Sequence, residues 1–196
     1  MAAVECCGHS LRDVENQTHE ICLAAVKKNG YALRDVKHQT HDICLAAVKQ
    51  NCYALRDVIN KTHTICQAAF EQNGNLLKYV EYPTYDMWMW AVQQNGHALQ
   101  YVKHQTHEIC IIAVITDCTA LQFVKDKTHN VCVLAIQQNS NSLRFLKYNH
   151  LNTKLIQAAL KHDSNALQYL DHYSQSMYSP YNPNDKLLEM LLFYNP

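Results

Sequence analysis

The chain has 196 residues with 17 basic and 17 acidic side chains, so its formal net charge is zero at neutral pH. The charges also balance locally, since residues 1–80 carry nine basic and eight acidic side chains. A balanced chain has no electrostatic footprint for nucleic acid or for an anionic membrane surface, and a hydrophobic content of 48% is that of a folded protein. We therefore expect neither a nucleic-acid partner nor a largely disordered chain.

The cysteines and the chain start indicate a soluble protein in a reducing, intracellular compartment. The nine cysteines are odd in number, and five of them share one position of an internal repeat, which favours packing over a disulfide scaffold. Met1–Glu5 lacks the basic and apolar segments of a secretory signal. The longest apolar run, residues 109–115, is too short to span a membrane.

The internal repeat organises the chain. A threonine recurs every 22 residues, at Thr18, Thr40, Thr62, Thr84, Thr106 and Thr128. Such a period is typical of a stacked array, because one unit of this size cannot bury a core alone. We predict about eight repeats over residues 1–170 with a truncated first repeat, then a loop over 171–185 and a capping or docking helix over 186–196.

Each repeat is predicted to contain a helix, a tight turn and a second, shorter helix. Thr18 stands at the N-cap position, and Ile21, Cys22, Ala25 and Val26 form one apolar stripe. After the first helix, three repeats have a glycine that we expect to adopt a left-handed conformation, namely Gly30, Gly74 and Gly96. Cys52, Cys118 and Ser140 take this place elsewhere and must accept strain or end the helix differently.

The second helix carries Ala32, Leu33 and Val36 on its inner side. No strand-like alternation interrupts the repeats, so the predicted fold class is an all-α solenoid, right- or left-handed. Leucine-rich repeats have a similar period but need an L-x-L strand, and ankyrin, tetratricopeptide and HEAT repeats are longer.

The repeat resembles a known family in residues 17–36, Gln-Thr-His-Glu-Ile-Cys-Leu-Ala-Ala-Val-Lys-Lys-Asn-Gly-Tyr-Ala-Leu-Arg-Asp-Val. This unit is similar to a short helical repeat of unknown function, common in giant DNA viruses of amoebae and present in amoeba-associated bacteria. The resemblance extends over roughly residues 2–170. It implies a giant-virus or amoeba-linked protein that acts as a structural or interaction module in the host cytoplasm or the virion. The family offers no catalytic motif to carry over.

The first three repeats share an adjacent basic and acidic residue, in the pairs Arg12-Asp13, Arg34-Asp35 and Arg56-Asp57. Stacked copies would align these charges along one face. Two readings remain open at this point: a row of solvated surface ion pairs, or a polar recognition strip.

The fourth repeat departs from the others because Trp88 and Trp90 replace a cysteine and an alanine. The added volume indicates either a local bend with an enlarged core or an exposed hot spot for a partner. From here on an aromatic residue replaces the acid of the Arg-Asp pair. This aromatic row consists of Tyr79, Tyr101, Phe123, Phe145 and Tyr169.

A histidine precedes the repeated cysteine by three residues, as in His19/Cys22, His41/Cys44 and His63/Cys66. The spacing places two zinc ligands on one helix face, but only two, and the cysteine belongs to the buried stripe. The histidines also stand at helix N-termini, where the dipole disfavours protonation. A metal- or pH-responsive module is therefore an alternative function, although we expect no metal site.

The leading hypothesis is a non-enzymatic scaffold for protein–protein interaction. The candidate protein-binding residues are the aromatic row, Trp88, Trp90, Arg34, Asp35, Arg56 and Asp57. A self-assembling structural component of a virion is the second hypothesis, through the uncapped start and the apolar C-terminal helix. We expect no cofactor, no small-molecule substrate and no catalytic residue, because no phosphate-binding loop or Ser/His/Asp arrangement is present.

Overall fold

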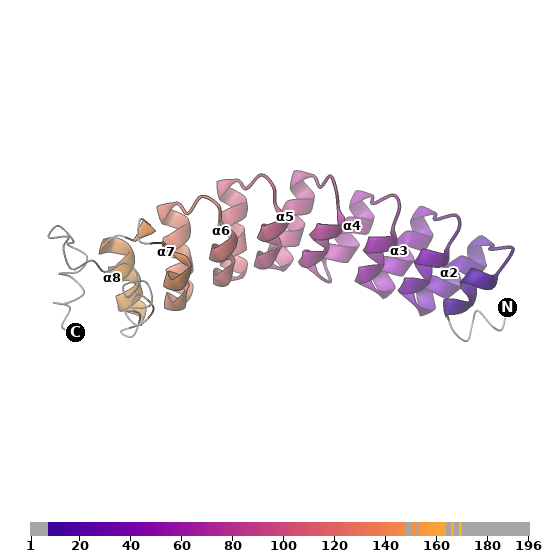
Figure 1. The fold of residues 1–196 in the computed structure, drawn as a ribbon, viewed down its shortest axis with the longest axis horizontal. Coiled ribbons are helices and arrows are strands. Elements are labelled where there is room, and N and C mark those ends of the chain that lie inside the picture. The colour runs from indigo at the N-terminus through magenta and orange to yellow at the C-terminus, as the bar shows by residue number, and fades with distance from the viewer. Residues whose placement is uncertain (1–7, 148–149, 152, 164–165, 167–168, 170–196) are drawn as a thin grey trace. The chain divides into compact units, whose positions relative to one another are not determined.

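The computed structural model describes residues 8–147, 150–151, 153–163, 166 and 169. These residues form helices, turns and loops without any strand, which confirms the all-α fold class (Figure 1). The chain divides into two compact units, Met1–Val102 and Lys103–Pro196. The predicted loop at 171–185 and helix at 186–196 lie outside the described residues, and a single array over 1–170 stays a prediction.

In the first unit, α-helices alternate with 3₁₀-helices of six residues. The elements are η1 (Gly8–Asp13), α2 (His19–Lys28), η2 (Gly30–Asp35), α3 (His41–Gln50), η3 (Cys52–Asp57), α4 (His63–Phe70), η4 (Gly74–Tyr79), α5 (Tyr85–Gln94) and η5 (Gly96–Tyr101). The second, shorter helix predicted for each repeat is thus a 3₁₀-helix.

The second unit repeats the same alternation. Its elements are α6 (His107–Thr116), η6 (Cys118–Phe123), α7 (His129–Gln138), η7 (Ser140–Phe145) and α8 (Thr153–His162).

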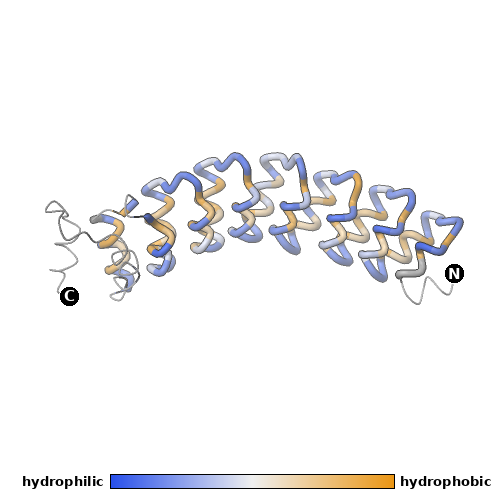
Figure 2. Tube along the Cα trace, viewed as in Figure 1, coloured by the Kyte–Doolittle hydropathy of each residue, from blue (hydrophilic) through white to orange (hydrophobic). Residues whose placement is uncertain are grey.

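Within each unit the helices form two layers (Figure 1). Each α-helix packs against the α-helix of the next repeat, and each 3₁₀-helix packs against the next 3₁₀-helix. The core lies between the layers, where Cys44, Ala47 and Val48 of α3 and Leu55 of η3 are buried. Figure 2 shows hydrophobic positions recurring along the helices and hydrophilic residues in the connecting loops. This stacking is the packing predicted for a helical-repeat solenoid.

The predicted threonine N-cap is confirmed in four repeats. The hydroxyl of Thr40 accepts a hydrogen bond from the backbone N–H of Ile43 at 3.4 Å, and the side chains of Thr18, Thr84 and Thr106 cap their helices in the same way. Thr62 and Thr128 occupy the same position without a side-chain capping bond. The sequence alone therefore overestimates how many of these threonines stabilise their helices as caps.

The predicted left-handed glycine is wrong, since no residue in the described part of the chain has a positive φ. Helix α2 instead ends at an extended asparagine: Asn29 has φ −144° and ψ 107°, and its N–H donates to Ala25 O. The side chain of Asn29 then accepts from the N–H of Tyr31 and begins the 3₁₀-helix. One polar residue thus ends the first helix and caps the second, so a cysteine or serine that follows it needs no left-handed backbone.

The glycine after this asparagine is explained by a close approach of the next repeat. A Cβ atom at Gly30 would lie 2.5 Å from the carbonyl oxygen of Ala47 in α3. Ser140 takes the same place in the second unit and donates its hydroxyl to Ala159 O of α8 at 3.2 Å. This position therefore contacts the α-helix of the following repeat, whichever small residue occupies it.

Candidate interaction surface

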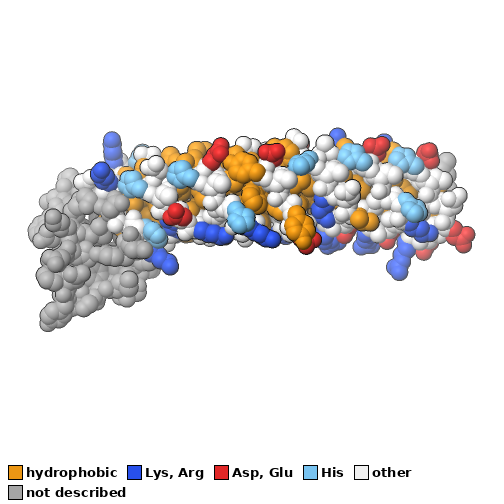
Figure 3. Space-filling view, turned by 90° about the horizontal axis from the view of Figure 1, so that it is seen from above, with side chains coloured by type: hydrophobic (Ala, Val, Ile, Leu, Met, Phe, Trp, Pro, Cys, Tyr) orange, Lys and Arg blue, Asp and Glu red, His pale blue; other side chains and the backbone are white. Residues whose placement is uncertain are grey.

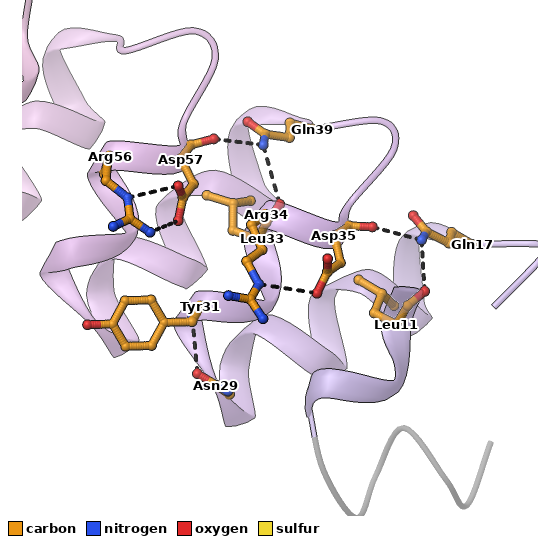
Figure 4. Close-up of polar contacts among 10 residues, drawn as sticks. All are labelled: Leu11, Gln17, Asn29, Tyr31, Leu33, Arg34, Asp35, Gln39, Arg56 and Asp57. Carbon is orange, nitrogen blue, oxygen red and sulfur yellow. Dashed lines mark hydrogen bonds and ion pairs between the residues drawn. The ribbon is translucent and has the colours of Figure 1, made fainter. Parts of the chain in front are cut away.

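The 3₁₀-helices turn two side chains per repeat outward. Residues i and i+3 share one side of a 3₁₀-helix, so Tyr31 and Arg34 leave the same side of η2, and Tyr53 and Arg56 leave the same side of η3. The ring of Tyr31 points away from Arg34, toward η3 (Figure 4). Tyr31 and Tyr53 are 39% and 45% exposed, which is high for large aromatic residues. We call these four residues the Tyr–Arg face. Because η2 and η3 pack side by side, the face is continuous across two repeats.

Each arginine of this face is fixed by the acid that follows it (Figure 4). Arg34 Nε lies 3.5 Å from Asp35 Oδ2, and Arg56 Nε lies 3.1 Å from Asp57 Oδ1. The arginine side chains are 55% and 56% exposed, whereas both aspartates are only 17% exposed. The Arg-Asp residues singled out in the sequence therefore form ion pairs in which the guanidinium is exposed and the carboxylate is largely buried.

The Arg56 pair is the better aligned of the two. Its Nε and Nη2 atoms donate to the two oxygens of Asp57 at 3.1 and 3.4 Å. These hydrogen bonds, together with the negative charge of Asp57, raise the pKa of Arg56. A guanidinium has five N–H groups, and Asp57 accepts from two of them. The other three can donate to a further acceptor.

The predicted aromatic row is half-buried. Tyr79, Tyr101, Phe123, Phe145 and Tyr169 are all intermediate in exposure. Two of them are covered by the basic residue beside them: Lys78 Nζ lies 4.9 Å from the ring centroid of Tyr79, and Arg144 Cζ lies 4.8 Å from that of Phe145. A cation–π contact thus replaces the ion pair at this repeat position. A role of the row in partner binding stays a prediction.

Trp88 and Trp90 are half-buried, so neither side chain is fully in the core or fully exposed. The ring of Trp90 meets the ring of His63 edge-on, with centroids 6.1 Å apart. Beside them, Tyr82 and Tyr85 are 83% and 40% exposed. The fourth repeat therefore does expose aromatic surface, but through its tyrosines more than its tryptophans.

The face drawn in Figure 3 carries charged side chains of both signs and histidines among apolar groups. This mixture agrees with the balanced charge of the sequence.

The histidines contact hydroxyls of the following repeat. His41 Nδ1 and Nε2 lie 3.5 and 3.4 Å from the hydroxyls of Thr62 and Thr64, and His63 Nε2 lies 3.1 Å from that of Thr84. Within the described residues, no three His, Cys, Asp or Glu side chains are grouped so as to hold a metal ion. His41 and His63 are thus part of the contact between repeats.

The repeated cysteines are buried, as their position in the apolar stripe predicts. Burial raises the pKa of the Cys66 and Cys132 thiols to about 11. Because the thiolate is the nucleophile, a thiol with a raised pKa is poorly reactive at neutral pH.

A row of glutamines connects neighbouring repeats, and the sequence analysis did not identify it. Gln39 Nε2 donates to Leu33 O of η2 and Asp57 O of η3, and its Oε1 accepts from the N–H of Ile59 (Figure 4). Gln17 makes the same three contacts one repeat earlier, and Gln105 bonds Phe123 O and Lys125 N–H in the second unit. We call this contact the glutamine bridge.

Lysine replaces the bridging glutamine in two repeats. Lys61 Nζ donates to Val58 O and Lys127 Nζ to Val124 O, both at 2.6 Å and both within the preceding repeat. The available signal for the bridge was the recurrence of glutamine just before the capping threonine. The exposed Tyr31 and Tyr53 could not be singled out from the sequence for a related reason, since only the 3₁₀ geometry places them on the same side of the helix as the arginines.

These features define an all-α helical-repeat protein in which apolar residues recur at the buried positions and an asparagine or aspartate caps the 3₁₀-helices η2 to η7, while the outward residues vary. Residues 18–61, which contain the two repeats α2–η2 and α3–η3, match the model of a family described as a domain of unknown function (DUF4116). This match supports the predicted resemblance to a repeat family of unknown function. No curated protein and no solved structure matched the chain. Across the described residues, no helix is both long enough and apolar enough to cross a membrane.

Proposed function

We propose that the protein is a non-enzymatic helical-repeat scaffold that binds another protein through the outward side chains of its 3₁₀-helices. The observation that carries this proposal is the exposure of two tyrosines beside two fixed arginines in consecutive repeats. Tyrosine and arginine are enriched among the residues that dominate binding energy at protein interfaces. The burial and raised thiol pKa of Cys66 and Cys132 support a packing role for the repeated cysteines instead of a catalytic one.

Affinity capture tests this function. The full chain, immobilised, is expected to retain a specific protein from an amoebal or infected-cell extract, and substitution of outward residues is expected to release it. Tyr53→Ala and Arg56→Ala are the primary variants, and Lys49→Ala in the preceding α-helix is the control. If every variant retains the captured protein as well as the wild type does, the proposal is contradicted.

Self-assembly is a second candidate, favoured by the surface of α6. Ile115 is 56% exposed, and Ile111 and Ile112 of the same helix are half-buried. We propose that this apolar surface contacts a second copy of the chain. The mass in solution should then rise with concentration and fall back to that of a monomer in Ile115→Lys, whereas a monomeric wild type at all concentrations would exclude this candidate.

The resemblance of the repeat also leads us to propose that the protein belongs to a giant virus of amoebae and acts in the host cytoplasm or the virion. Mass spectrometry of purified particles and of infected amoebae tests this origin. Absence of the protein from both samples would contradict it.

A further inference from the structure

The Tyr–Arg face presents basic groups outward and acidic groups inward. Both arginine side chains are more than half exposed while their aspartates are 17% exposed. A partner that approaches this face therefore meets guanidinium groups first, although the pairs are neutral overall. The aspartates hold Nε of each arginine, which limits the side-chain entropy that a partner would have to remove.

The remaining donors suit a carboxylate. Asp57 occupies Nε and Nη2 of Arg56, and the opposite edge of a guanidinium can still donate two parallel hydrogen bonds to one carboxylate. Tyr53 adds an exposed aromatic ring on the same side of η3, and its hydroxyl accepts a hydrogen bond from Asn73 Nδ2 of the following repeat at 3.3 Å. The ring is thereby held in place before a partner arrives.

The spacing of the repeats suits an extended chain. Neighbouring packed helices lie about 8–10 Å apart, so we expect the backbones of η2 and η3, which carry Arg34 and Arg56, to be spaced by about that distance. A polyproline II chain advances about 9 Å in three residues. Every third side chain of such a segment can thus meet an arginine in successive repeats.

We propose that the Tyr–Arg face binds an extended, acidic segment of a partner protein, with carboxylates at every third residue on Arg34 and Arg56. This inference rests on the proposed scaffold function and names the chemistry of its partner. Lys78 continues the row of basic groups in η4, and the tyrosines pack against the segment between the carboxylates. In the second unit, η6 has Thr119 and Gln122 at these two positions and does not offer such a face.

The test uses the full chain and a fluorescent twelve-residue peptide in which Glu-Pro-Ala is repeated four times. Fluorescence anisotropy at low salt should show saturable binding that weakens as salt is added. The Arg34→Gln/Arg56→Gln variant should bind about tenfold or more weakly, because two charge-assisted pairs are lost. The affinity of Arg34→Lys/Arg56→Lys for the peptide should lie between those of the wild type and the glutamine variant, since lysine keeps the charge but not the bidentate geometry.

The control removes the same charge from the same two repeats. Lys27→Gln/Lys49→Gln changes exposed lysines of α2 and α3 that are also 22 residues apart, and should leave the affinity within about twofold. Equal weakening in both double variants, or no binding of the peptide, would overturn the inference. Tighter, arginine-dependent binding of a twelve-nucleotide single-stranded DNA would overturn it in favour of nucleic acid.

Failure of the inference and failure of the scaffold function are distinguishable. If the acidic peptide does not bind but Tyr53→Ala still releases a captured protein, the scaffold function stands and the partner chemistry is wrong. If neither effect is seen, both are wrong.

Discussion

The first and second units contain 3₁₀-helices with the same buried and capping framework but with different outer surfaces. The contrast is clearest between η2 and η3 of the first unit and η6 of the second. Leu33, Leu55 and Leu121 are each 0% exposed, and the polar residues Asn29, Asn51 and Asp117 cap the three helices in the same way. Outward, the first two helices carry Tyr and Arg at the positions where η6 carries Thr119 and Gln122. The comparison indicates that the inward and capping residues determine the repeat, while the outward residues are free to acquire a partner.

The largest effect should come from the shared core. Leu55→Ala and Leu121→Ala each remove a fully buried side chain, so both should lower the free energy of unfolding by about 2–5 kcal/mol. Denaturant unfolding followed by circular dichroism measures both. A large loss in one unit and none in the other would show that the two frameworks are not equivalent.

Removal of the glutamine bridge should have the next largest effect on the free energy of unfolding. Gln39→Ala leaves the N–H of Ile59 and two carbonyls without their side-chain partner, which should cost about 1–3 kcal/mol. Gln105→Ala should cost a similar amount in the second unit. Lys61→Gln serves as the converse variant and should stabilise the chain by about 1 kcal/mol if it forms a new bridge. A stabilising Gln39→Ala would contradict the role of the bridge.

The threonine caps allow a comparison of identical residues. Thr40→Ala should cost about 0.5–2 kcal/mol because it removes the bond to Ile43 N–H. Thr62→Ala should cost less, since Thr62 makes no capping bond. Equal losses in thermal or denaturant unfolding would show that the cap is not what stabilises these helices.

Alkaline pH should weaken both units through their buried thiols. Burial raises the pKa of Cys66 and Cys132 from 9.0 to about 11, so between these values the unfolded chain loses protons that the folded chain keeps. The free energy of unfolding should therefore be unaffected by these thiols at pH 7 and should fall as the pH rises from about 9 to 11.

Cys66→Ala, measured with reductant present, should reduce this alkaline loss. An unchanged pH dependence in Cys66→Ala would contradict the assignment, and Cys132→Ala repeats the test in the second unit.

Much of the fold could be predicted from the sequence because the repeat shows at which positions apolar and capping residues recur. The period, the apolar stripe through Cys44 and Ala47, and the cap at Thr40 all follow from composition at fixed spacing. The glycine conformation was predicted wrongly, since a glycine after asparagine is also compatible with close packing, and the contact of Gly30 with Ala47 is not local.

The candidate surface was less predictable because it depends on geometry that the sequence does not show. A second helix was expected, but its 3₁₀ form decides that Tyr31 and Arg34 leave the same side of it. The sequence predicts the aromatic row as a binding surface because aromatic residues stand at an outer position of the repeat. In the structure, Lys78 and Arg144 cover two of these rings. The glutamine bridge joins atoms 18 to 20 residues apart and requires the stacked structure to be recognised.

The most direct test of the account replaces the outer surface of the first unit with that of the second. Tyr31→Thr, Arg34→Gln, Tyr53→Thr and Arg56→Gln together give η2 and η3 the outward residues of η6. Capture of the partner protein, measured beside thermal unfolding, should be lost while the melting temperature stays within a few degrees of the wild type, since exposed ion pairs contribute about 0–1 kcal/mol each. Full retention of the partner by a folded quadruple variant would contradict the claim that the outward 3₁₀ residues carry the function.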